Sequence, residues 1–426
     1  MSALLLVLLA QAASSRVITL QEAERLATER QPQIRAARAG TQAAEARADE
    51  ARSGLLPQLS GTASYQRSTA NIIPRPGFAT TSTTRSNDFT TFDFFSANLS
   101  LNQLIWDFGQ TTGRWRAAQA GAEATADTER STAQQVLFQV RSAFFTSRAD
   151  KELVGVAREN LDNQRKHLEQ IEGFVEAGTR PQIDLSSARA ATANAQVQLT
   201  TAENNYITSK ALLNQAMGVA GPLDYEVSDD ALPPVPGEDA DPAVLLQQAI
   251  AARPDIASLE QQVHVQQLTL RSVRGSYWPS LGGSVGFTQG GTRIDDLGWN
   301  LSAGVTLTWN LFQGGLTSAQ VRESEANIAN AVAQLDALRQ QVNVDVEQAR
   351  LAIRAGKATL VSAQKALVSA RDVLAQAEAR YQNGAGSVIE LGDAQVAAAQ
   401  AGAQVVQAEF QLAAARAQLL RALGRP

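Results

Sequence analysis

Apolar and polar residues alternate strictly along one segment in the second half of the chain. From Trp299 to Trp309 every odd position is apolar and every even position is polar or glycine. A period of two places the two sets on opposite faces of a β-strand. Such a strand spans about 33 Å, or about 25 Å of height at a tilt of roughly 40°. Since a tryptophan at each end is typical of the aromatic girdles of membrane strands, we predict that the apolar face contacts lipid.

Three further segments carry the same alternation. It is clear over Phe95–Asn102 and weaker over Leu59–Gln66 and Gly283–Thr288. Half-buried strands of a soluble sheet would show this pattern too, but the surrounding sequence offers no second apolar layer to cover them. Four strands cannot close a barrel, because small closed barrels need about eight. Two copies would leave too narrow an interior for a pore, so three copies and a twelve-stranded barrel are favoured.

Two long stretches predict helices far longer than those of globular domains. Arg116–Ala177 and Thr317–Asn383 contain no proline and are rich in Ala, Gln, Glu, Arg and Leu, which are good helix formers. At 1.5 Å per residue each helix would extend about 90–100 Å. A fibrous coiled coil would show the same pattern, so the helices alone leave both interpretations open.

The chain repeats itself. The segment SANLSL (96–101) resembles SAGVTL (302–307), and further matches follow at the same spacing. Each copy reads as helix, two strands, one very long helix, a glycine break and a return helix. The first copy has extra residues, which fall in a stretch rich in Pro, Gly, Ser and Thr (74–87) that predicts a long loop. We therefore expect a first repeat (13–218), a linker or equatorial segment (219–241) and a second repeat (242–426).

The first residues predict a secretory signal peptide (1–12). Ala3 to Ala10 forms an apolar run, and Ala10-Gln11-Ala12 follows as a small-x-small cleavage site.

Composition excludes several kinds of chemistry. The chain has no Cys and a net charge of -5, so disulfides, thiolate metal sites and a strongly basic nucleic-acid footprint are not expected. The two histidines, His167 and His264, lack metal-site spacing and are predicted to be solvated helix residues. No phosphate-binding loop or nucleophile elbow is found. We predict neither an enzyme nor a cofactor or metal site.

The order of short motifs resembles that of the TolC-like outer-membrane efflux family over nearly the whole chain after residue 12. The motifs are two strand-to-helix turns and two helix-to-helix turns: Leu104–Gly109, Asn310–Gly315, Glu176–Gly178 and Arg380–Gly384. The resemblance implies a mainly α fold with a membrane β-barrel. A homotrimer would form the twelve-stranded barrel in outer-membrane lipid and a long twelve-helix α-barrel in the periplasm, with each chain internally duplicated.

The resemblance also implies a function. The chain would be a passive exit duct of a tripartite efflux pump or type I secretion system in a Gram-negative outer membrane, exporting small molecules or proteins. Its partners would be a periplasmic adaptor and an inner-membrane pump of the RND, ABC or MFS type. A periplasmic helical-hairpin scaffold or adaptor is the alternative, but it leaves the alternating strands unexplained.

The family pattern points to a periplasmic entrance at the helix-to-helix turns. The tips that would contact the adaptor are Gly178, Thr179, Gly384 and Ala385. Glu390 and Asp393 resemble the acidic residues that line the family's constriction. Three copies would place six carboxylates around one hole, which favours cations. Glu390 also completes the sequence Ser387-Val388-Ile389-Glu390, a capping box, so it could serve the helix N-terminus instead or as well.

A second set of residues resembles the family's closing contacts. Tyr381 and Asp184 match an inter-helix pair that holds the tips together. Gly386 stands where the family's best-known member has an arginine, and it cannot make that arginine's tie. Arg180 occupies the equivalent place in the first copy and is a candidate substitute.

Overall fold

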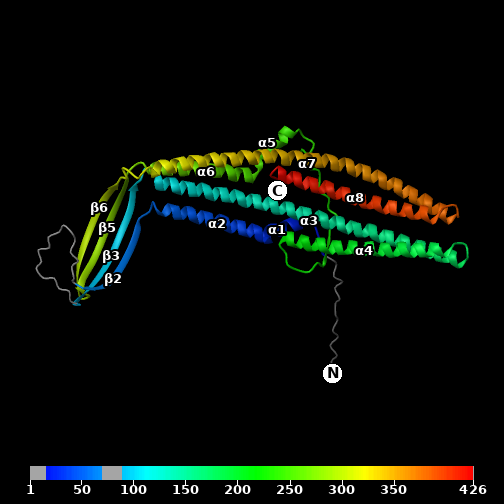
Figure 1. The fold of residues 1–426 in the computed structure, drawn as a ribbon, viewed down its shortest axis with the longest axis horizontal. Coiled ribbons are helices and arrows are strands. Elements are labelled where there is room, and N and C mark those ends of the chain that lie inside the picture. The colour runs from blue at the N-terminus through cyan, green and yellow to red at the C-terminus, as the bar shows by residue number, and fades with distance from the viewer. Residues whose placement is uncertain (1–15, 70–88, 426) are drawn as a thin grey trace, which may run out of the picture. The chain divides into compact units, whose positions relative to one another are not determined.

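The protein is mostly helical and carries one four-stranded sheet (Figure 1). The computed structural model describes residues 16–69 and 89–425. The predicted signal peptide (1–12) and the predicted long loop (74–87) lie outside the described residues. The first half of the chain contains β1 (Arg16–Ile18), α1 (Leu20–Arg30), α2 (Pro32–Ser53), β2 (Gln58–Thr69), β3 (Thr91–Trp106), α3 (Gln110–Glu176) and α4 (Gln182–Met217).

The second half repeats this order of elements after a connecting segment that contains β4 (Tyr225–Val227). Both α1 and α5 have 11 residues, α2 and α6 have 22, and α3 and α7 have 67, while α4 has 36 and α8 has 35. Both very long helices are therefore present where the sequence predicts them. The elements of this half are α5 (Pro242–Ala252), α6 (Pro254–Gly275), β5 (Ser280–Arg293), β6 (Asp296–Thr308), α7 (Leu316–Gln382) and α8 (Val388–Ala422).

The chain divides into two compact units, and each draws on both halves of the sequence. One unit contains the described residues up to Gly40, Ala126–Ala257, and the chain from Leu335 onward. The other contains Thr41–Thr125 and Ser258–Gln334, and so holds the whole four-stranded sheet.

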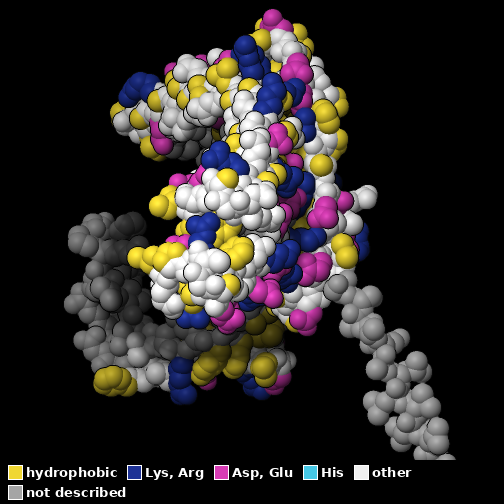
Figure 2. All heavy atoms as spheres, turned by 90° about the vertical axis from the view of Figure 1, so that its right-hand side faces the viewer, with side chains coloured by type: hydrophobic (Ala, Val, Ile, Leu, Met, Phe, Trp, Pro, Cys, Tyr) yellow, Lys and Arg dark blue, Asp and Glu magenta, His cyan; other side chains and the backbone are white. Residues whose placement is uncertain are grey.

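On the face seen in Figure 2, basic and acidic side chains are interspersed. Among the described helices, none combines the length and apolar character needed to cross a membrane.

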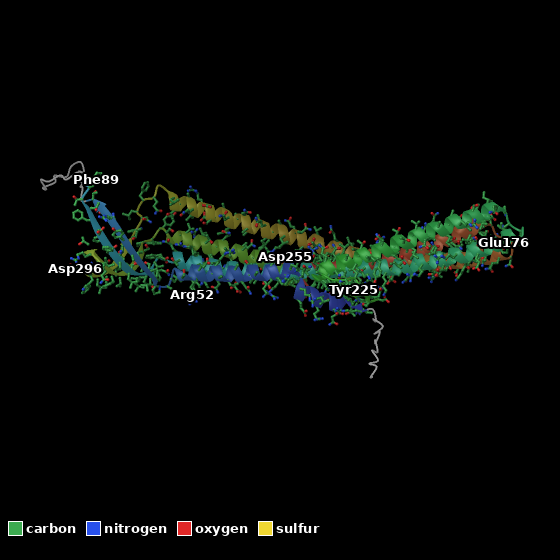
Figure 3. All side chains as sticks on the ribbon, turned by 90° about the horizontal axis from the view of Figure 1, so that it is seen from below. Arg52, Phe89, Glu176, Tyr225, Asp255 and Asp296 are labelled. Atoms are coloured by element: carbon green, nitrogen blue, oxygen red, sulfur yellow. The ribbon has the colours of Figure 1, made fainter. Side chains whose placement is uncertain are left out.

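The four-stranded sheet is antiparallel throughout, in the order β2-β3-β5-β6. The predicted strands around Leu59–Gln66, Phe95–Asn102, Gly283–Thr288 and Trp299–Trp309 are all confirmed, except that β6 ends one residue before Trp309. Phe89 and Asp296 mark the end of the sheet that is remote from Arg52 and the helices of this unit (Figure 3). Strands β2 and β6 are the two edges, and neither has a partner on its outer side within the described chain.

The strand register extends the alternation across the whole sheet. Leu99 lies between Gly61 and Phe287, and Phe287 in turn pairs with Leu301. On the opposite face lie Ser, Thr, Asn and Gly residues, where the hydroxyls of Ser60 and Ser100 are 2.8 Å apart. One face of the sheet is therefore mainly apolar and the other mainly polar. The alternating pattern of each strand becomes a surface because antiparallel pairing keeps residues of one parity on one side.

The turn from β3 into α3 is fixed by a single carboxylate. Asp107 accepts hydrogen bonds from the backbone nitrogens of Gly109 (3.2 Å) and Thr111 (2.7 Å), so it caps the first turn of α3. Phe108 between them has a φ of 52°, a left-handed conformation that costs energy for a side chain with a Cβ. The cap therefore sets the direction in which α3 leaves the sheet.

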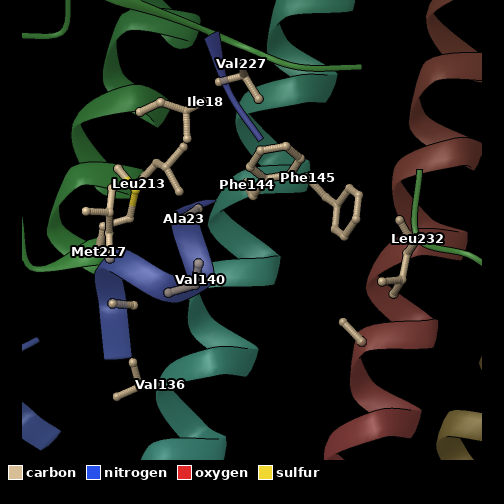
Figure 4. Packing of buried hydrophobic residues seen from close by; sticks show 14 of the residues in the cluster. Ile18, Ala23, Val136, Val140, Phe144, Phe145, Leu213, Met217, Val227 and Leu232 are labelled. Carbon is tan, nitrogen blue, oxygen red and sulfur yellow. The ribbon is translucent and has the colours of Figure 1, made fainter. Parts of the chain in front are cut away.

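The core of the other unit packs helices against a two-stranded parallel sheet (Figure 4). β1 pairs with β4, so the N-terminal strand is tied to the segment that joins the two halves. Phe144 of α3 and Leu213 of α4 are fully buried in this cluster. Lys210 lies within it too, and its ammonium donates to the carbonyls of Leu223 (2.9 Å) and Tyr225 (3.1 Å). Such satisfied donors make a buried cation tolerable.

Candidate functional site

The apolar face of the sheet is exposed. Leu301 and Val305 of β6 are 61% and 68% accessible, and Leu99 of β3 and Phe287 of β5 are also exposed. In the described chain nothing packs on this face. Contiguous exposed apolar surface of this kind marks a site of contact with lipid or with another protein.

Aromatic side chains gather at both ends of this sheet. Trp299 stacks on Phe287 near the end remote from the helices, with centroids 6.4 Å apart. At the helix end, the indole nitrogen of Trp309 donates to the carbonyl of Tyr277 (3.1 Å). Phe108 contacts both Trp106 and Trp278 at this end. The motif Leu104–Gly109 contains Trp106 and Phe108, but the sequence did not indicate that they meet Trp278. Trp278 precedes β5 and Phe108 follows β3, so their grouping depends on strand pairing rather than on any local pattern.

The two helix-to-helix turns have the same backbone geometry. Gly178, after α3, and Gly384, after α7, both have a φ of 70°. Thr179 N donates to Phe174 O (2.9 Å), and Ala385 N donates to Arg380 O (2.9 Å). Both helices therefore end in the glycine C-cap that satisfies their last carbonyls. The four residues predicted as tips, Gly178, Thr179, Gly384 and Ala385, are all exposed.

Tyr381 is the central side chain beside these turns. Only 1% of its surface is accessible, and it packs in a cluster with Ile171, Leu185 and Leu391. Its ring lies edge-on to that of His167 with centroids 5.1 Å apart. The Tyr381 hydroxyl has no hydrogen-bond partner among the described residues. Burial raises the pKa of Tyr381, the Arg180 charge opposes this shift and the Asp184 charge adds to it.

Arg180 joins the two turns. Its guanidinium carbon lies 4.9 Å from the centre of the Tyr381 ring, and its Nη2 lies 3.5 Å from the carbonyl oxygen of Gly386. The stacking is a cation–π contact. At Gly386 a Cβ would lie 3.0 Å from the backbone nitrogen of Tyr381. The end of α7 therefore leaves little room for a side chain at position 386. The structure thus brings together Arg180, Tyr381 and Gly386, with Asp184 near enough for its charge to act on Tyr381.

The two acidic residues predicted at the entrance lie on the first turns of α8, and both are exposed. Ser387 caps the helix, because its hydroxyl accepts from Glu390 N (3.1 Å). The Glu390 carboxylate lies 3.4 Å from Arg380 Nε of α7. The Ser387 half of the predicted capping box is therefore present. The Glu390 side chain instead forms an ion pair with Arg380 across the α7–α8 turn. Asp393 lies one turn further along α8.

His167 corrects one of the sequence predictions. We predicted a solvated residue, but His167 is 7% accessible and packs against Tyr381. Burial lowers its pKa, because an imidazolium would lose hydration there. His264, by contrast, is exposed as predicted. The hydrophilic sequence of α3 did not indicate this burial, because the burial depends on the packing of Tyr381 of α7 against His167.

Polar side chains continue around His167. Gln164 of α3 donates to Gln395 of α8 at 2.9 Å, and both side chains are buried. A polar hollow of roughly 240 Å³ lies between α3, α7 and α8, and His167, Tyr381, Lys166 and Glu378 are among its lining residues. The helices at this end are therefore joined by polar contacts as well as by the small apolar cluster around Tyr381.

An exposed apolar sheet face, a polar opposite face and two open strand edges are features of a membrane channel subunit. Comparison with known proteins agrees. The model of the outer membrane efflux protein family matches residues 24–219 and 245–425. The chain belongs to this family.

Individual relatives extend over most of the chain. Outer membrane efflux protein BepC of Brucella suis is 23% identical over 397 residues, covering 92% of this chain and 82% of BepC. Outer membrane protein TolC of Escherichia coli K12 is 27% identical over 379 residues, covering 85% of this chain and 73% of TolC. Among solved structures, a membrane protein from Pseudomonas aeruginosa superposes with a TM-score of 0.84 at 19% identity, covering 96% of this chain and 92% of that one. The protein is thus an outer-membrane exit duct of efflux systems, and its family consists of channel proteins.

Proposed function

We propose that three copies of the chain close a twelve-stranded barrel in the outer membrane, with β6 of each copy pairing with β2 of the next. The open edges of the four-stranded sheet carry this proposal, since unpaired strand edges cannot remain in a hydrocarbon environment. The mainly apolar face would contact lipid, with Trp299 and Trp309 in the two aromatic girdles. The mainly polar face, with its serine, threonine and asparagine rows, would line the pore.

The long helices of the three copies would form a twelve-helix tunnel through the periplasm. The matching lengths of α1, α2, α3 and α4 with α5, α6, α7 and α8 support an internal duplication, with repeats at 13–218 and 242–426 joined by 219–241. In the trimer, two similar repeats per copy would give a tunnel wall of near-uniform thickness. A signal peptide at 1–12 would direct export across the inner membrane.

The channel would act passively, with energy supplied by a periplasmic adaptor and an inner-membrane pump of the RND, ABC or MFS type. The exposed tips Gly178, Thr179, Gly384 and Ala385 would receive the adaptor. Named relatives include a cation efflux system protein, a pyoverdine export protein and a toluene efflux pump protein. One duct architecture therefore serves different cargoes, and the pump partner would choose the cargo here.

The helix-to-helix turns would form the periplasmic entrance. Glu390 and Asp393 of three copies would place six carboxylates around it, a ring that favours cations. Arg180 would hold the turns of one copy together through the Tyr381 ring and the Gly386 carbonyl, and Asp184 would act on Tyr381 through its charge. Arg180 would take the place of an arginine at position 386, because it reaches the Gly386 carbonyl from the other turn.

Single-channel recording in a planar bilayer tests this proposal. We expect a small wild-type conductance that rises clearly in the Glu390→Ala/Asp393→Ala variant, because the variant removes the carboxylates and the contact of Glu390 with Arg380. The Asp229→Ala/Asp239→Ala variant removes the same number of charges from exposed sites in the linker and should conduct like the wild type. An unchanged Glu390→Ala/Asp393→Ala channel would limit Glu390 to its contacts at the turn. Failure of folded wild-type protein to insert at all would contradict the duct itself.

A further inference from the structure

Two phenylalanines break the polar pattern on one face of the sheet. Phe92 and Phe94 lie near the start of β3, where they pair with Ser68 and Gln66 of β2. They share parity with Ser96, Asn98 and Ser100, which belong to the mainly polar face. Both rings are exposed, at 50% and 46%.

A close contact confirms which way the Phe94 ring points. A Cβ built on Gly290 of β5 would lie 3.2 Å from Phe94 Cζ. Gly290 pairs with Ser96, so its side-chain direction is that of the polar face. The ring of Phe94 therefore lies over the space that the missing side chain of Gly290 leaves free.

The neighbouring aromatic side chains point the other way. Tyr65 pairs with Phe95, and their ring centroids are 5.1 Å apart on the mainly apolar face. Phe94 and Phe95 are adjacent in the chain and so lie on opposite faces of the strand. A membrane girdle explains Tyr65 and Phe95, but it does not explain Phe92 and Phe94.

The location of this pair is equally specific. Thr91 begins β3 beside Thr69, the last residue of β2, at the same end of the sheet as Phe89 (Figure 3). From Ser96 to Asn102, the residues of β3 on the polar face are Ser and Asn only, and their partners on β2 are Ser, Thr and Gln. This part of the polar face is uncharged and hydrophilic, and the two rings stand at its outer end.

We infer that Phe92 and Phe94 form an aromatic collar at the outer mouth of the channel. This rests on the proposed trimeric barrel, in which three copies would contribute six rings to two adjacent levels of the pore, about 7 Å apart along each strand. An apolar constriction holds water poorly and so opposes the passage of hydrated ions. The collar is a second restriction, separate from the acidic entrance at the helix-to-helix turns.

The absence of cysteine from the sequence allows a direct test of which face each ring occupies. Phe94→Cys, Phe95→Cys and Ser96→Cys would each be reconstituted in a bilayer and exposed to a charged, membrane-impermeant methanethiosulfonate. We expect reaction at positions 94 and 96, with a fall in conductance at 94, and no reaction at the lipid-facing position 95. Reaction at 96 without reaction at 94 would overturn the inference while leaving the channel intact.

The restriction itself is tested by removing the rings. Phe92→Ala/Phe94→Ala would be recorded in the Glu390→Ala/Asp393→Ala background, so that the periplasmic entrance does not dominate the total electrical resistance of the channel. We expect a higher conductance than in the parent, while the matched control Phe95→Ala stays at the parent value. Equal conductance in all three would contradict the collar. If neither position 96 reacts nor any channel forms, the proposed duct fails instead.

Discussion

At the α7–α8 turn, Tyr381 is held between two side chains that differ in charge and burial. Arg180 stacks on its ring and His167 packs edge-on to it. The sequence singled out Tyr381, Asp184 and Arg180 because they stand at positions that match a family pattern. It gave no sign of His167, since a histidine in a glutamine-rich helix looks solvated until a neighbouring helix covers it.

The burial of His167 predicts a stability that depends on pH. Its pKa is lowered in the folded protein, so the unfolded chain binds a proton more readily near pH 6.5. Stability is therefore fully present above the unfolded pKa and falls as the pH drops toward the folded pKa. We expect the wild type to lose more thermal stability between about pH 7 and about pH 5 than His167→Gln does.

His264 supplies the matched control for this measurement. It is the only other histidine in the sequence and it is exposed. Melting temperatures of His264→Gln should follow the wild-type pH dependence. If His167→Gln shows the wild-type slope as well, other groups set the acid sensitivity.

At the scale of elements, two glycines of α3 lie in different surroundings. Gly113 of α3 lies against Ser272 of α6, where a Cβ would come within 2.8 Å of Ser272 Cβ and 3.0 Å of its Cα. Gly155, also within α3, has nothing within 4 Å of its Cβ position. Gly113 therefore allows α3 and α6 to approach closely, whereas Gly155 faces open space.

These two glycines predict opposite effects of the same substitution. Gly155→Ala should stabilise the protein by about 0.5–1 kcal/mol, because alanine loses less backbone entropy in a helix. Gly113→Ala should destabilise it by about 1–3 kcal/mol, because the backbone of α6 must move. Thermal or denaturant unfolding of both variants checks the difference, and equal shifts would show that α3 and α6 do not need this close contact.

The strands illustrate what a local pattern can predict. Alternation alone located β6 and the better part of β3, because each residue's face follows from its parity. The alternation was clear only from Phe95 onward, so it did not show that β3 extends to Thr91 and thereby places Phe92 and Phe94 on the polar face, at the end remote from the helices. The aromatic group of Trp106, Phe108 and Trp278 likewise required strand pairing to assemble.

At the scale of the whole molecule, the two open edges of the sheet determine how copies would associate. Strand β2 ends the sheet on one side and β6 on the other. Strand β6 of one copy would therefore pair with β2 of the next. Such head-to-tail contacts generate closed rings when the rotation permits. Three copies of four strands would satisfy the minimum of about eight strands and would leave an open interior.

Cross-linking tests this association directly in the cysteine-free chain. A panel of double variants would combine Cys at position 62, 64 or 66 of β2 with Cys at position 300, 302 or 304 of β6. We expect at least one pair to give a covalent trimer on oxidation, seen on a non-reducing gel. The single variant Ser100→Cys, in the inner strand β3, should give none. Pairs that stop at dimers would contradict a closed ring of three.

The sequence by itself determined the long helices, the alternating strands and the glycine turns, because each depends on residues close together in the chain, and it showed the family resemblance through the order of its motifs along the chain. Alternation, helix propensity and turn chemistry act over a few residues, so they can be read locally. Only the tertiary structure decided that His167 is buried, that Arg180 reaches Gly386 and Tyr381, and that Glu390 pairs with Arg380. The contacts of His167 and Arg180 join the first half of the chain to the second, whereas Glu390 meets Arg380 across the α7–α8 turn. In each case the packing of one helix on another is not written in the local pattern of either.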